Sequence, residues 1–381
     1  MKTPICEMLG IEFPLLAFSH CRDVVVAVSK AGGMGVFGAV TYTPEELEEE
    51  LKWIDDHIDG MPYGVDTIVP NKSAGRDEGV TPEKVMAMLP DEQKGFAASI
   101  LEKYGIDASG LDGYRADTMK FTENIRNADA TGLLDVAFSH PIKLIANALG
   151  VPPKVMMDYG KKHGVPVAAL VGAKEHALAQ VAAGVDILVV AGGEAGGHCG
   201  DVSTMVLIPE VFEAVRPISD VPILAAGGIV TGRQMAASMA MGADGAWCGS
   251  VWLTTPESEA TPTVRQKLLQ ASSRDTVRSR SRTGKHSRQL RSPWTDAWEA
   301  EGAPTPLPMP LQSLVSEPAM REVDKVAQSG HAGAVDLSTY WVGQGVGLMN
   351  QEMSAGAVVQ EFKEDFLRAY ERLTDQLMAG E

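Results

Sequence analysis

Short apolar runs alternate with longer amphipathic segments along most of the chain. Each run has six to eight residues and ends at glycine or a polar residue. The segments between them carry apolar residues at helical spacing. Parallel strands need a crossover that is usually a helix, so this alternation predicts successive strand–helix units. Eight runs have this character: 13–18, 33–40, 62–69, 142–149, 166–172, 186–192, 222–228 and 245–250.

The clearest helix start is at Thr43, which is followed three residues later by Glu46 in the capping-box arrangement. We expect a helix over 43–58, and similar patterns predict others over 23–31, 173–184 and 231–242. Eight strand–helix units fit a closed (β/α)₈ TIM barrel better than an open sheet. The predicted fold class is therefore α/β, with the barrel spanning 1–258.

Three segments extend this minimal barrel. Residues 70–141 form an insertion between the third and fourth strands that is too long for one helix, and we expect it to be a lid. Residues 259–350 carry little barrel pattern and are expected to be an appended segment that lines the substrate site. The tail, 351–381, contains an amphipathic stretch that predicts a helix packed on the barrel.

Composition narrows the function further. The formal net charge of −17 makes nonspecific binding to nucleic acid unfavourable. The four cysteines have neither C-x-x-C nor zinc-site spacing, which indicates reduced thiols, and no metal site is expected. No apolar run approaches the ~18 residues typical of a membrane span. These features predict a soluble, cytoplasmic protein that acts on a small molecule.

One stretch opposes the overall charge. Residues 265–291 hold nine Lys or Arg against one acid, Asp275. Two interpretations stay open. These side chains could form a solvated face paired with acidic helices, or they could bind an anionic ligand or partner.

Glycines follow three consecutive strands at the end where barrel enzymes bind their ligands. The stretch "GGEAGGHCG" follows the sixth, "GGIVTG" the seventh and "GS" the eighth. These glycines could merely form tight turns. Three aligned sets favour a nest of backbone N–H groups that binds phosphate.

The combination of "AGGEAGGHCG", "ILAAGGI" and "GADGAWCGS" resembles the nitronate monooxygenase family. "LGIEFPLL", "SKAGGMGVFGA" and "PYGVD" near the N-terminus, and the late "WVGQGVGLMN", are similar to that family's opening and closing segments. The resemblance implies a TIM barrel that binds FMN and no metal.

The resemblance also implies roles for particular residues. Gly227, Gly228, Gly249 and Ser250 would hold the FMN phosphate, while Ala17 and Phe18 would back the flavin ring. The turn beside the flavin would be lined by Gly192, Gly193, Gly196 and Gly197, and Gln344 falls in a closing segment near the cofactor.

His198 matches the family's active-site histidine. A neutral imidazole has a pKa near operating pH and can take the acidic α-proton of a nitroalkane. With FMN as redox cofactor and O₂ as co-substrate, the products would be a carbonyl compound and nitrite. The alternative is an NAD(P)H-dependent FMN reductase of a quinone or an enoyl or CoA-type thioester. The basic stretch would suit a phosphorylated ligand of such a reductase.

Two positions depart from the family pattern. Asp66 stands where relatives usually have Asn, and a carboxylate cannot donate the hydrogen bond that an amide donates. We expect either an altered flavin potential or a protonated Asp66. Ser19 and His20 stand where relatives often have an apolar pair. His20 could be a second acid or base, bind substrate, or cap the next helix.

Overall fold

The computed structural model describes residues 1–68, 82–115, 118 and 130–379. Eight parallel strands close into a barrel in the order β1-β2-β3-β4-β5-β6-β8-β9. The barrel closes where Leu16 of β1 pairs with Trp247 of β9. The strands are β1 Leu15–Ser19, β2 Met34–Gly38, β3 Tyr63–Thr67, β4 Leu144–Asn147, β5 Val167–Val171, β6 Ile187–Ala191, β8 Ile223–Ala226 and β9 Gly245–Cys248. The predicted TIM barrel is confirmed. Seven strands lie inside their predicted apolar runs, and β1 extends one residue past its run, to Ser19.

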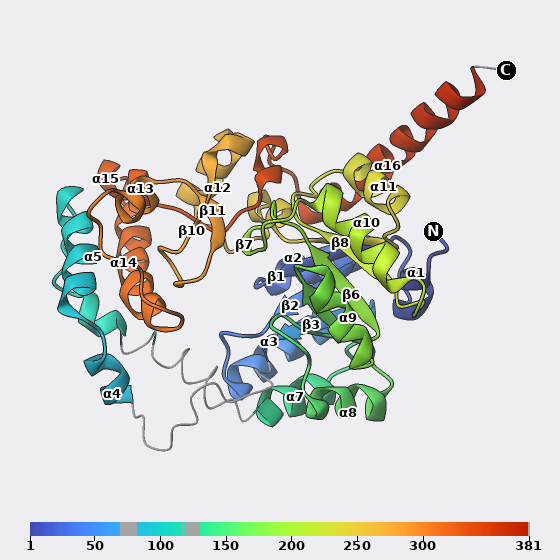
Figure 1. Cartoon of the computed structure of the whole chain (residues 1–381), viewed down its shortest axis with the longest axis horizontal. Coiled ribbons are helices and arrows are strands. Elements are labelled where there is room, and N and C mark those ends of the chain that lie inside the picture. The colour runs from blue at the N-terminus through green and yellow to red at the C-terminus, as the bar shows by residue number, and fades with distance from the viewer. Residues whose placement is uncertain (69–81, 116–117, 119–129, 380–381) are drawn as a thin grey trace.

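Helices surround this barrel (Figure 1). The predicted capping box is present on α3, since Thr43 and Glu46 each accept a hydrogen bond from the other's backbone N–H. Apolar faces of the surrounding helices pack on the outward-facing strand residues in two large cores. The helices of this layer are α2 Arg22–Lys30, α3 Pro44–His57, α7 Ala130–Ser139, α8 Lys154–His163, α9 Lys174–Ala182, α10 Thr204–Val215 and α11 Gly232–Ala240.

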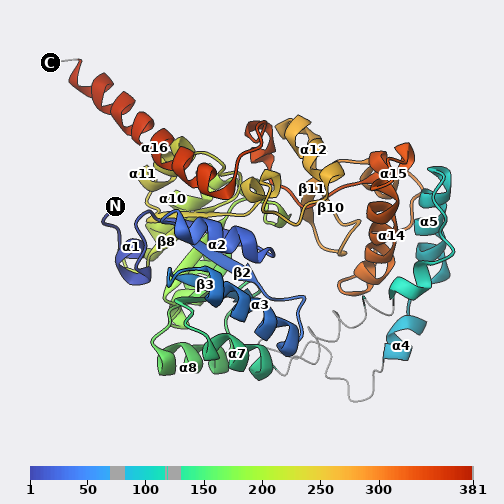
Figure 2. The ribbon, with the colours of Figure 1, turned by 180° about the vertical axis from the view of Figure 1, so that it is seen from behind.

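The helix that closes this layer comes from the end of the chain. Helix α16, Ala355–Met378, packs against both α11 and α2, so it occupies the eighth helical position. Arg233 at the start of α11 binds the buried carboxylate of Asp365 through Nε and Nη2, at 2.9 and 2.6 Å from Oδ1. The distal half of α16 projects away from the body of the molecule (Figures 1 and 2).

A short helix that the apolar pattern does not predict closes the other end of the barrel. Helix α1, Pro4–Leu9, buries Ile5, Cys6 and Leu9 in the same core as the inward-facing strand residues. This core fills the barrel with aliphatic side chains, so the barrel is a packed interior rather than a channel. No helix of the described residues is long and apolar enough to cross a bilayer.

The insertion and the appended segment share a second core. Residues of α4 and α5 pack with α13, α14 and α15, and α5 lies beside α14 in both views (Figures 1 and 2). The expectation that the insertion 70–141 forms a lid stays a prediction. Parts of this insertion, within 69–81, 116–117 and 119–129, lie outside the described residues. The helices are α4 Pro82–Ala87, α5 Asp91–Lys103, α13 Pro293–Glu299, α14 Leu311–Ala327 and α15 Ala332–Leu337.

The remaining elements connect this second core to the barrel. Strands β10, Thr276–Ser279, and β11, Ser287–Leu290, form an antiparallel hairpin, and β11 also pairs with the two-residue strand β7, Gly197–His198. This pairing carries the hairpin to the barrel loop that contains His198. The other connecting elements are η1 Ser250–Thr254, α12 Pro262–Gln270, η2 Ser273–Asp275 and η3 Gln344–Leu348.

Candidate active site

The glycine turns after β6, β8 and β9 meet at the carboxyl end of the barrel. Thr204, at the start of α10, joins two of them, because its Oγ1 lies 2.9 Å from both Gly227 O and Glu194 Oε2. Gly192 must lack a side chain here, since a Cβ would lie 2.4 Å from Thr204 N. The glycines therefore allow the close approach that brings these backbones together.

Three backbone N–H groups at this junction are free. Within the described residues, those of Gly227, Gly228 and Gly249 donate to no protein acceptor. Gly228 has a φ of 72°, in the left-handed region that favours glycine. Adjacent unpaired N–H groups attract an anion, so the residues present fit the phosphate of a cofactor.

The closing segment lies on the same turns. Gly343 N donates to Ser250 Oγ at 2.8 Å, and Gln344 N donates to Glu194 O at 2.9 Å. Gly196 packs against the backbone of Gly343. The structure thus brings together the predicted residues of the sixth, seventh and eighth strand ends and the segment containing Gln344.

An aromatic cluster lies next to the glycine turn after β9, because β1 and β9 are neighbouring strands. The Phe18 ring stacks on Trp247, with centroids 6.2 Å apart, and meets the His20 ring edge-on at 5.1 Å. His20 Nδ1 lies 3.0 Å from Gly38 O. This cluster offers an apolar wall of the kind that a planar ring system packs against.

Two predicted residues at the end of β1 point elsewhere. The Ala17 side chain is buried among residues of the outer core, between strands and helices. Ser19 Oγ accepts a hydrogen bond from Cys21 N at 3.0 Å, at the turn into α2. A flavin at the barrel mouth would therefore meet the side chain of Phe18, and of Ala17 only the backbone.

His198 stands on strand β7, beside the hairpin from the second core. Its register partner on β11 is Ser287, and its Nε2 lies 2.8 Å from Thr283 Oγ1. The side chain is accessible to solvent, yet protein surrounds much of the ring. This desolvation, together with the positive charge of Lys285, lowers the pKa of His198. The lowered pKa favours the neutral imidazole.

Thr283 and Lys285 are functional candidates that the sequence patterns did not single out. They lie in the turn between β10 and β11, inside the basic stretch. The excess of positive charge in that stretch was the available signal, but it gave no sign of which residue contacts His198.

Most of the basic stretch is paired. Arg278 Nη2 lies 2.5 Å from Asp201 Oδ1, and Arg288 Nε donates to Gly193 O at 2.9 Å. Within the described part of the chain, five of the nine cations have no acidic partner: Lys267, Arg274, Arg280, Lys285 and Arg288. Of these, Arg280 Nε donates to Gly284 O at 2.9 Å. The remaining pairings are Arg265 with Glu352, Lys267 with the carbonyls of Val335, Asp336 and Ser338, Arg282 with Glu317, and Arg291 with Asp296.

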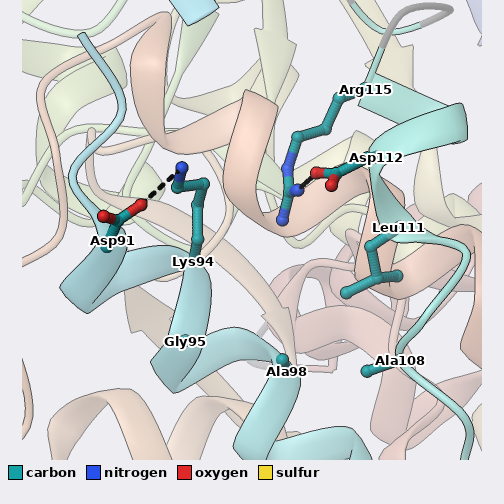
Figure 3. A pocket seen from close by; sticks show the side chains of 8 residues that line it. All are labelled: Asp91, Lys94, Gly95, Ala98, Ala108, Leu111, Asp112 and Arg115. Carbon is teal, nitrogen blue, oxygen red and sulfur yellow. Dashed lines mark hydrogen bonds and ion pairs between the residues drawn. The ribbon is translucent and has the colours of Figure 1, made fainter. Parts of the chain in front are cut away.

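A separate pocket lies between α5 and the residues that follow it (Figure 3). Lys94 is paired with Asp91 at 2.7 Å, and Arg115 with Asp112, so each cation in it has its own carboxylate. Its lining contains neither His198 nor any of the glycine turns. Among the residues that the structure describes, no group of three His, Cys, Asp or Glu could hold a metal ion.

A closed eight-stranded parallel barrel, with free backbone donors and a neutral histidine at its carboxyl end, defines a TIM-barrel enzyme. The family model for nitronate monooxygenase matches residues 2–365. The chain belongs to the nitronate monooxygenase family and is an oxidoreductase of that type. The resemblance inferred from the sequence motifs is confirmed.

Individual relatives agree with this assignment. A Mycobacterium tuberculosis protein named as monooxygenase Rv1533 is 49% identical over 96% of this chain and 97% of its own length. A Staphylococcus saprophyticus protein named as a nitronate monooxygenase is 27% identical over 94% of this chain and 96% of its own.

Solved structures show the same fold. Nitroalkane oxidase from Streptomyces ansochromogenes is 24% identical with a TM-score of 0.75, covering 97% of this chain and 99% of that one. FabK from Thermotoga maritima is also 24% identical, with a TM-score of 0.69 and 99% of both chains covered.

Proposed function

We propose that this enzyme binds FMN and oxidises nitronates or nitroalkanes with O₂ to a carbonyl compound and nitrite. The observation that carries the proposal is the position of His198, held by Thr283 at one side of the barrel mouth that the free glycine N–H groups also line. Bound FMN would supply the electron acceptor. The donor groups of Gly227, Gly228 and Gly249 would hold its phosphate.

His198 would act as the base through Nδ1. Thr283 Oγ1 lies 3.3 Å from both the carbonyl oxygen and the amide nitrogen of Lys285. If the hydroxyl donates to that carbonyl, its lone pairs accept from Lys285 N–H and from His198 Nε2–H. This arrangement leaves the Nδ1 lone pair free to take the α-proton of a nitroalkane. The nearby Lys285 ammonium would then favour the nitronate anion that results.

The proposed base is tested by replacing His198 with Asn, which keeps a polar side chain but cannot take the proton at neutral pH. We expect His198→Asn to lose turnover of a neutral nitroalkane and to retain most turnover of the preformed nitronate. Equal losses on both substrates would assign His198 to binding rather than to proton transfer. Nitrite release and oxygen uptake are the measurements.

A second candidate is an NAD(P)H-dependent reductase of a quinone or a thioester. The observation that favours it is a group of cations in and before the hairpin that have no acidic partner, Arg274, Arg280 and Lys285, which suits a phosphorylated ligand. Anaerobic mixing separates the two. Bleaching of the bound flavin by a nitronate and not by NADH or NADPH supports the oxidase, and the reverse supports the reductase. Purified protein that takes up no FMN would refute both.

A further inference from the structure

The inference concerns Asp66, near the carboxyl end of β3. Its side chain is 1% exposed, and neither carboxyl oxygen has a hydrogen-bond partner within the described residues. The other buried acid of the described chain, Asp365, is satisfied by Arg233. A buried polar group without a partner is costly, and a buried charge without a partner is far costlier.

The register places the Asp66 side chain on the inward face of the barrel. Asp66 is the register partner of Gly38 on β2 and of Ala146 on β4. Ala146 belongs to the core that fills the barrel, together with Val36 and Leu144. Side chains of partnered residues on neighbouring strands share one face, so the Asp66 carboxyl group also faces inward, near the mouth.

Among the residues that the structure describes, no charged group compensates Asp66. Gly38 and Ala146, on the neighbouring strands, are both uncharged. The titratable group nearby is His20 of the β1 end, whose ring occupies the space in front of Gly38: a Cβ there would lie 2.6 Å from His20 Nδ1. His20 is bonded to Gly38 O and has no hydrogen bond to Asp66. Burial alone raises the pKa of Asp66 well above its usual value.

We propose that Asp66 is protonated at neutral pH and that its carboxyl O–H donates a hydrogen bond to an acceptor atom of the flavin ring at the barrel mouth. The second half rests on the proposed binding of FMN. A neutral carboxyl group has one donor and an acceptor oxygen, and a side-chain amide likewise offers both a donor and an acceptor. The proposal accounts for the missing protein partner, because a ring carbonyl or nitrogen of the cofactor would supply it.

The opposite arrangement is an ionised Asp66 that accepts a hydrogen bond from a ring N–H. It would place a full negative charge in an aliphatic interior with no cation to offset it. The two arrangements predict different consequences for Asp66→Asn. The amide reproduces a neutral donor, whereas it removes the charge of a carboxylate. Asp66→Leu removes the hydrogen-bonding oxygens in both cases and keeps the branched shape of the side chain.

Infrared spectroscopy of protein carrying carboxyl-labelled aspartate tests protonation without any turnover. We expect a protonated-carboxyl C=O band at pH 7 that is present in the wild type, absent in Asp66→Asn, and shifted when FMN is added. Absence of the band at pH 7 overturns the proposal. A band that FMN does not shift overturns the donor role.

FMN affinity tests the hydrogen bond itself. We expect Asp66→Asn to bind FMN within about threefold of wild type, and Asp66→Leu to bind about tenfold more weakly, the size of one lost hydrogen bond. Wild-type affinity in Asp66→Leu would overturn the donor role. If Asp66→Leu does not fold, a loss of tenfold or more in Asp66→Asn overturns it equally. If the wild type binds no FMN, the proposed function fails, and so does the proposed hydrogen bond from Asp66 to the flavin. The infrared C=O band still reports whether Asp66 is protonated.

Discussion

The buried ion pair between Arg282 and Glu317 ties the hairpin beside His198 to the second core. Arg282 Nε and Nη2 each donate to a Glu317 carboxylate oxygen at 2.8 Å. The guanidinium also lies 4.3 Å from the centroid of the Trp341 ring. The Arg282 side chain is 5% exposed, and that of Glu317 is 25% exposed. Replacement of Arg282 by Met keeps much of the aliphatic volume and removes the charge.

We expect Arg282→Met to lower the free energy of unfolding by about 3 kcal/mol. Removal of one member of a buried pair costs about 3–5 kcal/mol, since the other is left without compensation. The lower end applies because Glu317 is partly open to solvent and recovers some hydration. The lost contact with Trp341, worth about 0.5–2 kcal/mol, is included in this figure. The next residue in the chain, Thr283, contacts His198. The same change should therefore also make the position of the His198 side chain less fixed.

The assay is urea unfolding followed by tryptophan fluorescence, since Trp294 and Trp298 lie in the second core. The matched variants are Glu317→Leu and the double variant Arg282→Met with Glu317→Leu. The double variant should lose less than the sum of the single losses, because it leaves no unpaired charge. A loss below about 1 kcal/mol for Arg282→Met, or additive losses in the double variant, would refute the reasoning.

Three further changes test other parts of the molecule. Burial raises the pKa of Asp324 to about 6, so the folded state binds more protons than the unfolded state between about pH 4 and 6. The stability of the folded state therefore falls as pH rises through this range. Asp324→Asn should raise the urea midpoint at pH 7 and leave it unchanged at pH 4. Lys285→Met should raise the pKa of His198 and move the acidic limb of the pH–rate profile to higher pH, whereas Lys285→Arg should leave it in place. Gly228→Ala, at a φ of 72°, should lower the free energy of unfolding by about 1–2 kcal/mol through backbone strain, and it should also lower the amount of flavin that the purified protein retains. The control is Gly60→Ala, at a φ of 73° with open space around it, which should show the loss of stability alone.

The barrel could be predicted because each strand is buried on both faces. Such strands appear as continuous apolar runs with glycine or polar ends, and the helices between them keep a helical spacing of apolar residues. Helix α1 could not be found in the same way. It has six residues, fewer than two turns, so its apolar positions show no period, and its burial depends on the barrel end that it covers.

The candidate residues on the glycine turns could be predicted for a related reason. The carboxyl ends of consecutive barrel strands converge, so a local sequence signal after each strand becomes a shared site. The surroundings of His198 have no such local signal. Ser287 pairs with it across an antiparallel register between residues far apart in the chain, and the glycine-rich turn around His198 does not resemble a strand.

The barrel and the second core contribute different residues to the candidate site, as the pairing of β7 with β11 shows. Under the proposed function, the barrel would hold the cofactor phosphate with its own backbone, because the free N–H groups of Gly227, Gly228 and Gly249 all follow barrel strands. The barrel does not supply the residues around the His198 side chain. Thr283 and Lys285 come from a hairpin that the Arg282–Glu317 pair anchors on α14. A change in the second core is therefore expected to alter the surroundings of His198 without contacting the proposed phosphate site. Substrate preference should respond to substitutions of Thr283 and Lys285 while flavin affinity stays constant.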